Sequence, residues 1–169
     1  MIVYHGSNVA VKEPRLIRQN RSLDFGSGFY TTLNEMQAAS FADKVYRRNK
    51  MEGTPTVSVY EFDEQTAYAA CSLLQFETPN EEWLDFVSDH RNKAYSGESY
   101  ELTYGPVADD DIFLTFALYA GGGISKEETL NRLKVKKLFN QLVFSSEKAL
   151  SYLKFQRILD EEEMAKWTK

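Results

Sequence analysis

The sequence is poor in cysteine, histidine and proline. Its 169 residues include one cysteine, two histidines and four prolines. A single cysteine excludes an internal disulfide and a cysteine-rich zinc site, so the composition suits a reducing compartment. The surrounding pattern predicts that Cys71 is a buried core residue rather than a nucleophile.

Long apolar runs are lacking as well. No stretch approaches the roughly 18 consecutive apolar residues that a membrane span needs, and the first residues show no basic region followed by a long apolar core. We therefore expect neither a membrane span nor a signal peptide, no membrane partner, and a cytoplasmic location.

An excess of positive charge is also missing. The formal net charge is −5 at pH 7, which argues against broad electrostatic binding of nucleic acid, although a small local basic patch remains compatible with it. The chain is rich in apolar residues, with 43% hydrophobic and 14% aromatic side chains. This size and composition predict a single compact domain over residues 1–169.

The spacing of apolar residues predicts short strands interspersed with helices. Predicted strands cover residues 1–5, 29–32, 56–62, 100–107, 142–144 and 152–159, and predicted helices cover 34–48, 78–92, 112–119 and a short segment from 125. Residues 66–76 fit a helix or a strand, and residues 160–163 fit a solvated tail or a helix. Because strands and helices do not alternate regularly, the predicted fold class is α+β rather than a doubly wound sheet.

Residues 24–32, Asp-Phe-Gly-Ser-Gly-Phe-Tyr-Thr-Thr, are the most informative stretch of the chain. Gly26 and Gly28 permit a tight turn or a close backbone approach. The residues that follow predict a strand in which Phe29 and Tyr30 point to opposite faces. We interpret this segment as a turn and strand that bind a ligand.

Two clusters that suggest ligand chemistry have a simpler structural interpretation. Asp109, Asp110 and Asp111 invite a metal hypothesis, but carboxylates at the start of an apolar helix are what capping and the helix dipole favour. Residues 121–123 are three glycines without the Lys-Ser/Thr continuation of a phosphate-binding loop, so a helix end or hinge is favoured. No metal site is predicted.

Three segments together resemble a known enzyme superfamily. Residues 4–7 read Tyr-His-Gly-Ser, residues 25–30 read Phe-Gly-Ser-Gly-Phe-Tyr, and residues 140–144 read Asn-Gln-Leu-Val-Phe. In this order they resemble the signature of the ADP-ribosyltransferase superfamily, in its His-Tyr-Glu branch, and more closely a bacterial family of unknown function grouped with it. The resemblance spans nearly the whole chain and implies an ADP-ribosyltransferase-like split β-sandwich with peripheral helices.

The resemblance also implies NAD⁺ as the substrate and assigns roles to individual residues. Gly6 offers its backbone to the nicotinamide carboxamide, His5 hydrogen-bonds a ribose hydroxyl on the adenosine side, and Tyr30 stacks on the nicotinamide ring. The implied catalytic residues are His5, Tyr30 and Gln141. The implied NAD-binding residues are Tyr4, His5, Gly6, Ser7, Gly28, Phe29, Tyr30 and Thr31.

Gln141 departs from the superfamily pattern. A glutamate at this position hydrogen-bonds the 2′-hydroxyl of the nicotinamide ribose and stabilises the developing positive charge. An amide retains the hydrogen bond but lacks the charge. The substitution predicts slow cleavage of NAD⁺ and single transfer rather than polymer elongation.

The acceptor of the ADP-ribose group is the least readable part of the sequence. In enzymes of this fold the loop before the third segment faces the acceptor, which implicates Lys134, Lys136, Lys137 and Phe139. A protein or a nucleic acid is expected as the macromolecular acceptor, although the lysines equally fit a solvated helix end. The favoured function is mono-ADP-ribosyl transfer by a bacterial toxin with a small neutralising antitoxin protein. The alternatives are an NAD⁺ glycohydrolase and a module that binds NAD⁺ or ADP-ribose without chemistry.

Overall fold

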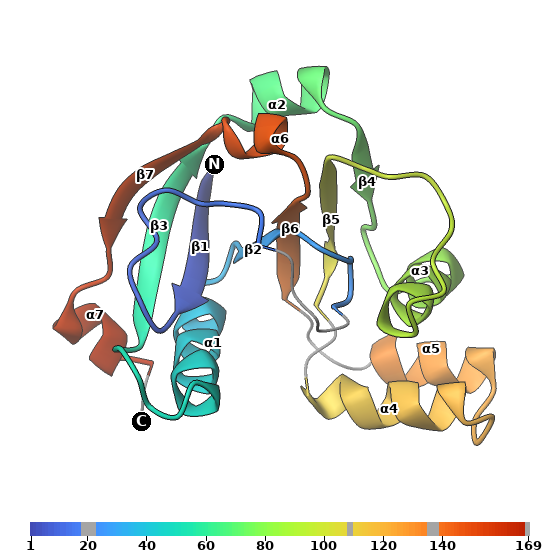
Figure 1. Ribbon diagram of the computed structural model, residues 1–169. Helices are drawn as coiled ribbons and strands as arrows, with labels where there is room; N and C mark the ends of the chain where they lie inside the picture. The colour runs from blue at the N-terminus through green and yellow to red at the C-terminus, as the bar shows by residue number, and fades with distance from the viewer. Residues whose placement is uncertain (18–22, 108–109, 135–138, 168–169) are drawn as a thin grey trace.

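The computed structural model describes residues 1–17, 23–107, 110–134 and 139–167 (Figure 1). Over these residues the chain folds into one mixed, open sheet of seven strands accompanied by seven helices, which confirms the predicted α+β class. The strands are β1 (Ile2–Ser7), β2 (Phe29–Thr32), β3 (Thr56–Phe62), β4 (Leu73–Gln75), β5 (Leu102–Pro106), β6 (Asn140–Phe144) and β7 (Leu153–Ile158). The helices are α1 (Glu35–Arg48), α2 (Glu64–Ala70), α3 (Glu81–Arg91), α4 (Asp110–Ala120), α5 (Lys126–Lys134), α6 (Glu147–Leu150) and α7 (Glu161–Ala165).

The sheet has two well-paired parts that meet at one weak junction. Its strand order is β4-β5-β6-β2-β1-β3-β7, and every neighbouring pair is antiparallel except β4 and β5. Each residue of β1 has a register partner in β3, whereas β1 and β2 share the single pair Tyr4 and Thr32. The parts β4-β5-β6-β2 and β1-β3-β7 are therefore joined by little of the backbone ladder (Figure 1).

Helix α1 covers the β1-β3-β7 part. Asn34 caps the helix by accepting a hydrogen bond from the backbone N–H of Gln37 at 2.9 Å. Three small residues at helical spacing, Ala38, Ala39 and Ala42, are buried against Val57 and Val59 of β3. Their small size lets the helix lie very close to the sheet.

Helices α3, α4 and α5 form a second layer on the other part of the sheet, at the right of Figure 1. Asn80 caps α3, and Trp83, Phe86 and Val87 are buried. They share a core with Phe116 of α4, with Leu130 and Leu133 of α5, and with Phe25, Phe76 and Val143. This core encloses one side of the loop that precedes β2.

Several predicted boundaries were wrong for identifiable reasons. Strand β1 continues to Ser7 instead of ending at residue 5, because Gly6 and Ser7 pair with β3. Residues 66–76, which fitted either structure, contain both: the end of α2 and strand β4. The predicted strand 100–107 is shorter in the structure, where β5 ends at Pro106. One further backbone hydrogen bond follows it, in which Val107 donates to the Phe139 carbonyl at 2.7 Å.

The acidic cluster, Cys71 and the expected lack of a membrane span can each be compared with the structure. Helix α4 begins at Asp110, so Asp110 and Asp111 lie in its first turn, while Asp109 falls outside the described residues. Cys71 is buried, as predicted, and burial raises the pKa of its thiol. In the described part of the chain, no helix combines the length and apolar character needed to cross a membrane.

Candidate functional site

The three segments singled out in the sequence lie on adjacent strands at the centre of the sheet. Thr32 of β2 is opposite Tyr4 of β1 on one side and opposite Gln141 of β6 on the other. Opposed residues share a face of a sheet, and so do residues two apart along a strand. Gly6, Tyr30 and Gln141 are therefore on the same face, around the junction between the two parts of the sheet.

His5 bridges that junction. Its Nδ1 lies 2.7 Å from the backbone carbonyl oxygen of Tyr30, and its ring stacks on Phe29 with centroids 4.3 Å apart. A carbonyl oxygen only accepts hydrogen bonds, so Nδ1 carries the proton and donates it. In the neutral ring Nε2 then bears a lone pair and can accept a hydrogen bond.

Burial lowers the pKa of His5 below its ordinary value of 6.5, despite the opposing effect of the Tyr30 carbonyl. We expect the free energy of unfolding to decrease as the pH falls below 6.5. The unfolded chain takes up a proton at 6.5, whereas the folded chain does so only at the lowered pKa. The stability that neutral His5 contributes is thus fully present above pH 6.5 and is lost as the pH falls through the folded-state pKa.

Urea unfolding of the wild type and of His5→Gln across this range measures the effect. Burial also lowers the pKa of His90, the second histidine, so the wild type reflects both groups. His5→Gln should retain a shallower pH dependence than the wild type, and His90→Gln provides the matched comparison. Identical slopes for His5→Gln and the wild type would contradict the assignment.

The loop before β2 holds the Tyr30 side chain at its hydroxyl. This hydroxyl donates to the Gly26 carbonyl at 2.7 Å and accepts from the Phe25 N–H at 3.1 Å. Gly26 has φ of +77°, so the predicted turn is present and depends on glycine at this position. Burial raises the pKa of the phenol, which therefore stays neutral. The ring, fixed in place by its hydroxyl, is what Tyr30 can offer to a ligand.

Gln141 carries a buried donor without a partner. The residue is 6% exposed, and its Nε2 has no hydrogen-bond partner among the described residues. A buried, unsatisfied amide costs free energy, which makes it a candidate for contact with a ligand. The neighbouring Thr32 hydroxyl, by contrast, already has partners, the side chain of Gln37 and the Asn140 carbonyl.

Packing alone explains why position 6 is a glycine. A Cβ at this position would lie 2.1 Å from the carbonyl oxygen of Ala38 and 2.8 Å from the amide nitrogen of Ala42. Only glycine lets the backbone of α1 approach β1 this closely. The close approach also brings the first turn of α1, with Gln37, to the edge of the candidate site.

Comparison with known proteins places the chain in a family. The family model "Protein of unknown function (DUF3990)" matches residues 1–155. The chain belongs to the DUF3990 family. The match includes β1, β2 and β6, and hence all three segments of the candidate site. A search of curated proteins and a search of solved structures each found no match.

Not every predicted binding side chain of this DUF3990 chain faces the site. Phe29 and Thr31 lie on the opposite face of β2, both buried, and the Thr31 hydroxyl donates to the Leu142 carbonyl at 2.9 Å. Their side chains are therefore part of the core, and only their backbone remains for binding. Tyr4 packs against the α1 layer, and Ser7 lies at the end of β1, 3.5 Å from the Asn8 side chain.

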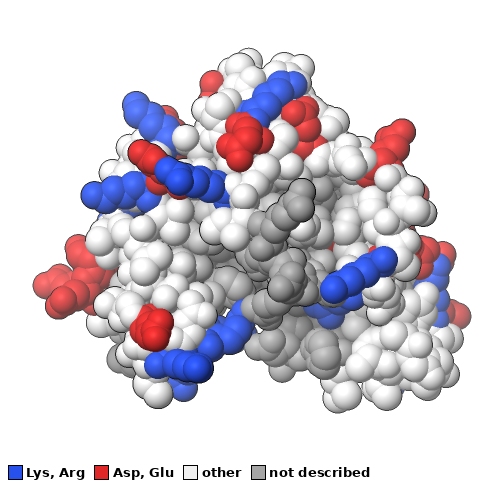
Figure 2. Space-filling model, in the orientation of Figure 1, with Lys and Arg blue, Asp and Glu red and all other residues white. Residues whose placement is uncertain are grey.

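The predicted acceptor-facing residues of the DUF3990 chain are only partly described. Lys136 and Lys137 fall outside the described residues, and Lys134 is the last residue of α5. Phe139 is half-buried, and its carbonyl joins β5 to the start of β6. On the face shown in Figure 2, acidic and basic side chains of the described residues are interspersed.

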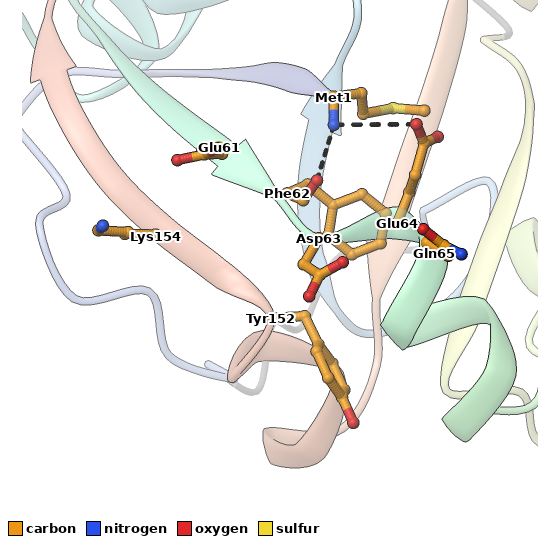
Figure 3. A pocket seen from close by; sticks show the side chains of 8 residues that line it. All are labelled: Met1, Glu61, Phe62, Asp63, Glu64, Gln65, Tyr152 and Lys154. Carbon is orange, nitrogen blue, oxygen red and sulfur yellow. Dashed lines mark hydrogen bonds and ion pairs between the residues drawn. The ribbon is translucent and has the colours of Figure 1, made fainter.

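Two cavities in the described part of the DUF3990 chain, each of about 420 Å³, lie beside the predicted residues rather than among them. The first lies at the N-terminal end of β1, away from His5 and Gly6 (Figure 3). There the Met1 amino group donates to the Phe62 carbonyl at 2.7 Å and lies 3.9 Å from Glu64. The second has Phe25, Gly26 and His90 in its wall, so it adjoins the loop that holds Tyr30. Among the described residues, no three His, Cys, Asp or Glu side chains converge as metal ligands would.

Sequence reasoning missed the residues that hold this loop from outside. Asp24 lies within the glycine-containing stretch, but its partner is Arg91, at the end of α3, at 2.7 Å. Nothing in the sequence around Arg91 distinguishes it from the basic residues that commonly end helices. The only available signal was the acidic residue immediately before the aromatic and glycine pair.

Proposed function

We propose that this chain is an NAD⁺-dependent mono-ADP-ribosyltransferase with a sheet of the ADP-ribosyltransferase type. The observation that carries the proposal is that the adjacent strands β1, β2 and β6 bring together Gly6, Tyr30 and Gln141 on one face, while His5 contacts the Tyr30 carbonyl from the other face. The division of the sheet into two parts at this point supports the split architecture that the sequence resemblance implies. NAD⁺ suits these residues chemically. Tyr30 offers an aromatic ring, Nε2 of His5 offers a hydrogen-bond acceptor, and Nε2 of Gln141 offers an amide donor.

The reaction breaks the bond between the nicotinamide nitrogen and the ribose carbon. The bonding electrons go to the nicotinamide, which leaves as a neutral ring, and a nucleophile of the acceptor bonds to the ribose carbon and loses its proton. Tyr30 holds the cationic ring by stacking before it leaves. His5 carries its proton on Nδ1, so its Nε2 accepts a hydrogen bond from a ribose hydroxyl and orients the nucleotide.

Gln141 contacts the ribose whose bond breaks. Its unpartnered Nε2 donates to a hydroxyl oxygen, which satisfies the buried amide, and its Oε1 can accept from a hydroxyl. The amide brings no negative charge to the developing carbocation. We therefore propose slow turnover and single transfer, in which binding geometry provides most of the acceleration.

The first test is nicotinamide release from NAD⁺ by the purified protein. Tyr30→Ala should lower kcat/KM about tenfold, the scale of one desolvated contact between an aromatic ring and a cation. Tyr46→Ala, which removes a half-buried tyrosine of α1, is the matched control and should leave release unchanged. Loss of activity in both variants, or in neither, would contradict the role of Tyr30.

Radiolabelled NAD⁺ in the presence of host lysate separates transfer from hydrolysis. Label in a macromolecule supports the transferase, and release to water alone supports a glycohydrolase. We further propose that the protein acts in the cytoplasm on a protein or nucleic acid, with a small antitoxin protein as its neutralising partner. Toxicity on expression that His5→Ala relieves would support this part.

A second function, binding of NAD⁺ or ADP-ribose without chemistry, is favoured by one specific observation. Position 141 carries an amide where a transferase of this type uses a carboxylate, and the amide is buried on the face shared with Tyr30. Calorimetric binding of ADP-ribose with no detectable nicotinamide release would favour this module over the enzyme.

A further inference from the structure

Arg91 joins three elements that are far apart in the sequence. Its Nε and one terminal nitrogen, Nη2, each lie 2.7 Å from Oδ1 of Asp24, in the loop before β2. Its guanidinium carbon lies 4.7 Å from the centroid of the Phe116 ring in α4. Arg91 itself ends α3, so one side chain links α3, α4 and the loop.

This ion pair is sheltered from solvent. The side chains of Arg91 and Asp24 are 20% and 13% exposed, whereas those of the surface pair Arg132 and Glu128 are 45% and 50% exposed. Screening by water is weaker at the sheltered pair, and both of its short contacts are charge-assisted. The Arg91 contact therefore constrains the loop more strongly than a surface pair would.

The constrained loop is the one that holds Tyr30. Asp24 directly precedes Phe25 and Gly26, whose N–H and carbonyl groups bind the Tyr30 hydroxyl. The contacts thus run without interruption from Phe116 through Arg91 and Asp24 to the aromatic ring of the candidate site. Any shift of α3 or α4 relative to the sheet acts on Tyr30 along this path.

We propose that Arg91 is a positioning residue, which couples the helical layer α3–α4 to Tyr30 through Asp24 and so sets how tightly the site holds the nicotinamide ring. The ligand named here rests on the proposed function. The coupling of Arg91 to the Tyr30 hydroxyl rests on the contacts alone. The two parts can fail separately.

Amide hydrogen exchange at Phe25 tests the coupling without any ligand, because this N–H is bound to the Tyr30 hydroxyl. In Arg91→Met, which keeps the aliphatic stem near Phe116, exchange at Phe25 should be about tenfold faster than in the wild type, the scale of one lost charge-assisted hydrogen bond. Arg91→Lys, which keeps the charge, should restore part of the protection. Arg132→Met, the matched surface control, should leave it unchanged.

The kinetic readout is the KM for NAD⁺ against kcat. Arg91→Met should raise KM about tenfold with little change in kcat, and in a Tyr30→Phe background, which lacks the hydroxyl, Arg91→Met should add little. Because Arg91→Met leaves Asp24 charged and sheltered, the double variant Asp24→Asn with Arg91→Met provides a folded alternative with the same expected effect.

The outcomes are distinguishable. Unchanged Phe25 exchange in both Arg91→Met and the double variant would overturn the positioning role, as would the same acceleration at all amides of α3. If the wild type releases no nicotinamide and binds no NAD⁺, the proposed function fails. Phe25 exchange then still decides whether Arg91 holds the loop.

Discussion

Gly6→Ala is expected to lower the free energy of unfolding by about 3 kcal/mol, the upper end for an extra methyl group forced into a packed interior. The new Cβ would lie 2.1 Å from the Ala38 carbonyl oxygen, which belongs to the backbone of α1 and cannot rotate away. Relief requires α1 to move off β1, which exposes its buried alanines. Urea unfolding followed by circular dichroism measures the change.

Gly122→Ala is the control for this substitution. A Cβ at Gly122 has open space around it, but its φ is +71°, so the cost is conformational strain alone, about 1 kcal/mol. Equal destabilisation by the two variants would show that the contact between α1 and β1 is not what requires glycine at position 6.

Gln141→Glu is expected to accelerate nicotinamide release about a hundredfold, the lower end of what one well-placed electrostatic group contributes to a transition state. The carboxylate would sit opposite Thr32, on the face shared with Tyr30, and offset the positive charge that develops on the ribose. Burial disfavours the ionised form and raises the pKa of a carboxyl group here. The gain should therefore increase with pH.

Single-turnover measurements of nicotinamide release over a pH series test this prediction. Gln65→Glu, at an exposed position of α2, adds the same charge away from the site and should leave the rate unchanged. A folded Gln141→Glu protein that binds NAD⁺ but releases nicotinamide no faster than the wild type would contradict the assignment of position 141 to the reacting ribose.

Local chemistry made much of the fold predictable. Asn34 and Asn80 precede amphipathic stretches, and both cap helices as their side chains allow. The alternation in residues 56–62 predicted β3, and the glycines before Phe29 predicted the turn at Gly26. Each of these features depends only on residues a few positions apart, so the sequence alone is enough to predict it.

Features that depend on distant pairing could not be predicted in this way. Asp24 and Arg91 are 67 residues apart, and they meet because α3 packs over the loop. No sequence pattern near either residue predicts this packing. The order β5-β6-β2 places a late strand between two earlier ones. The resemblance at residues 140–144 suggested a shared site, yet the register that sets Gln141 opposite Thr32 needed the folded sheet.

The junction between β1 and β2 has a consequence for the motions of the molecule. The backbone ladder joins the two sheet parts through one register pair, whereas each part is held internally by many more backbone hydrogen bonds. The His5 side chain and the ring contacts of Phe29 with Tyr60 and of Phe144 with Phe62 add to this junction. Separation along this line breaks few backbone hydrogen bonds, so its cost is set mainly by the aromatic contacts and the apolar core that the two parts share. A molecule that bound residues of both β1 and β2 would bridge this junction and gain affinity from suppressing its opening.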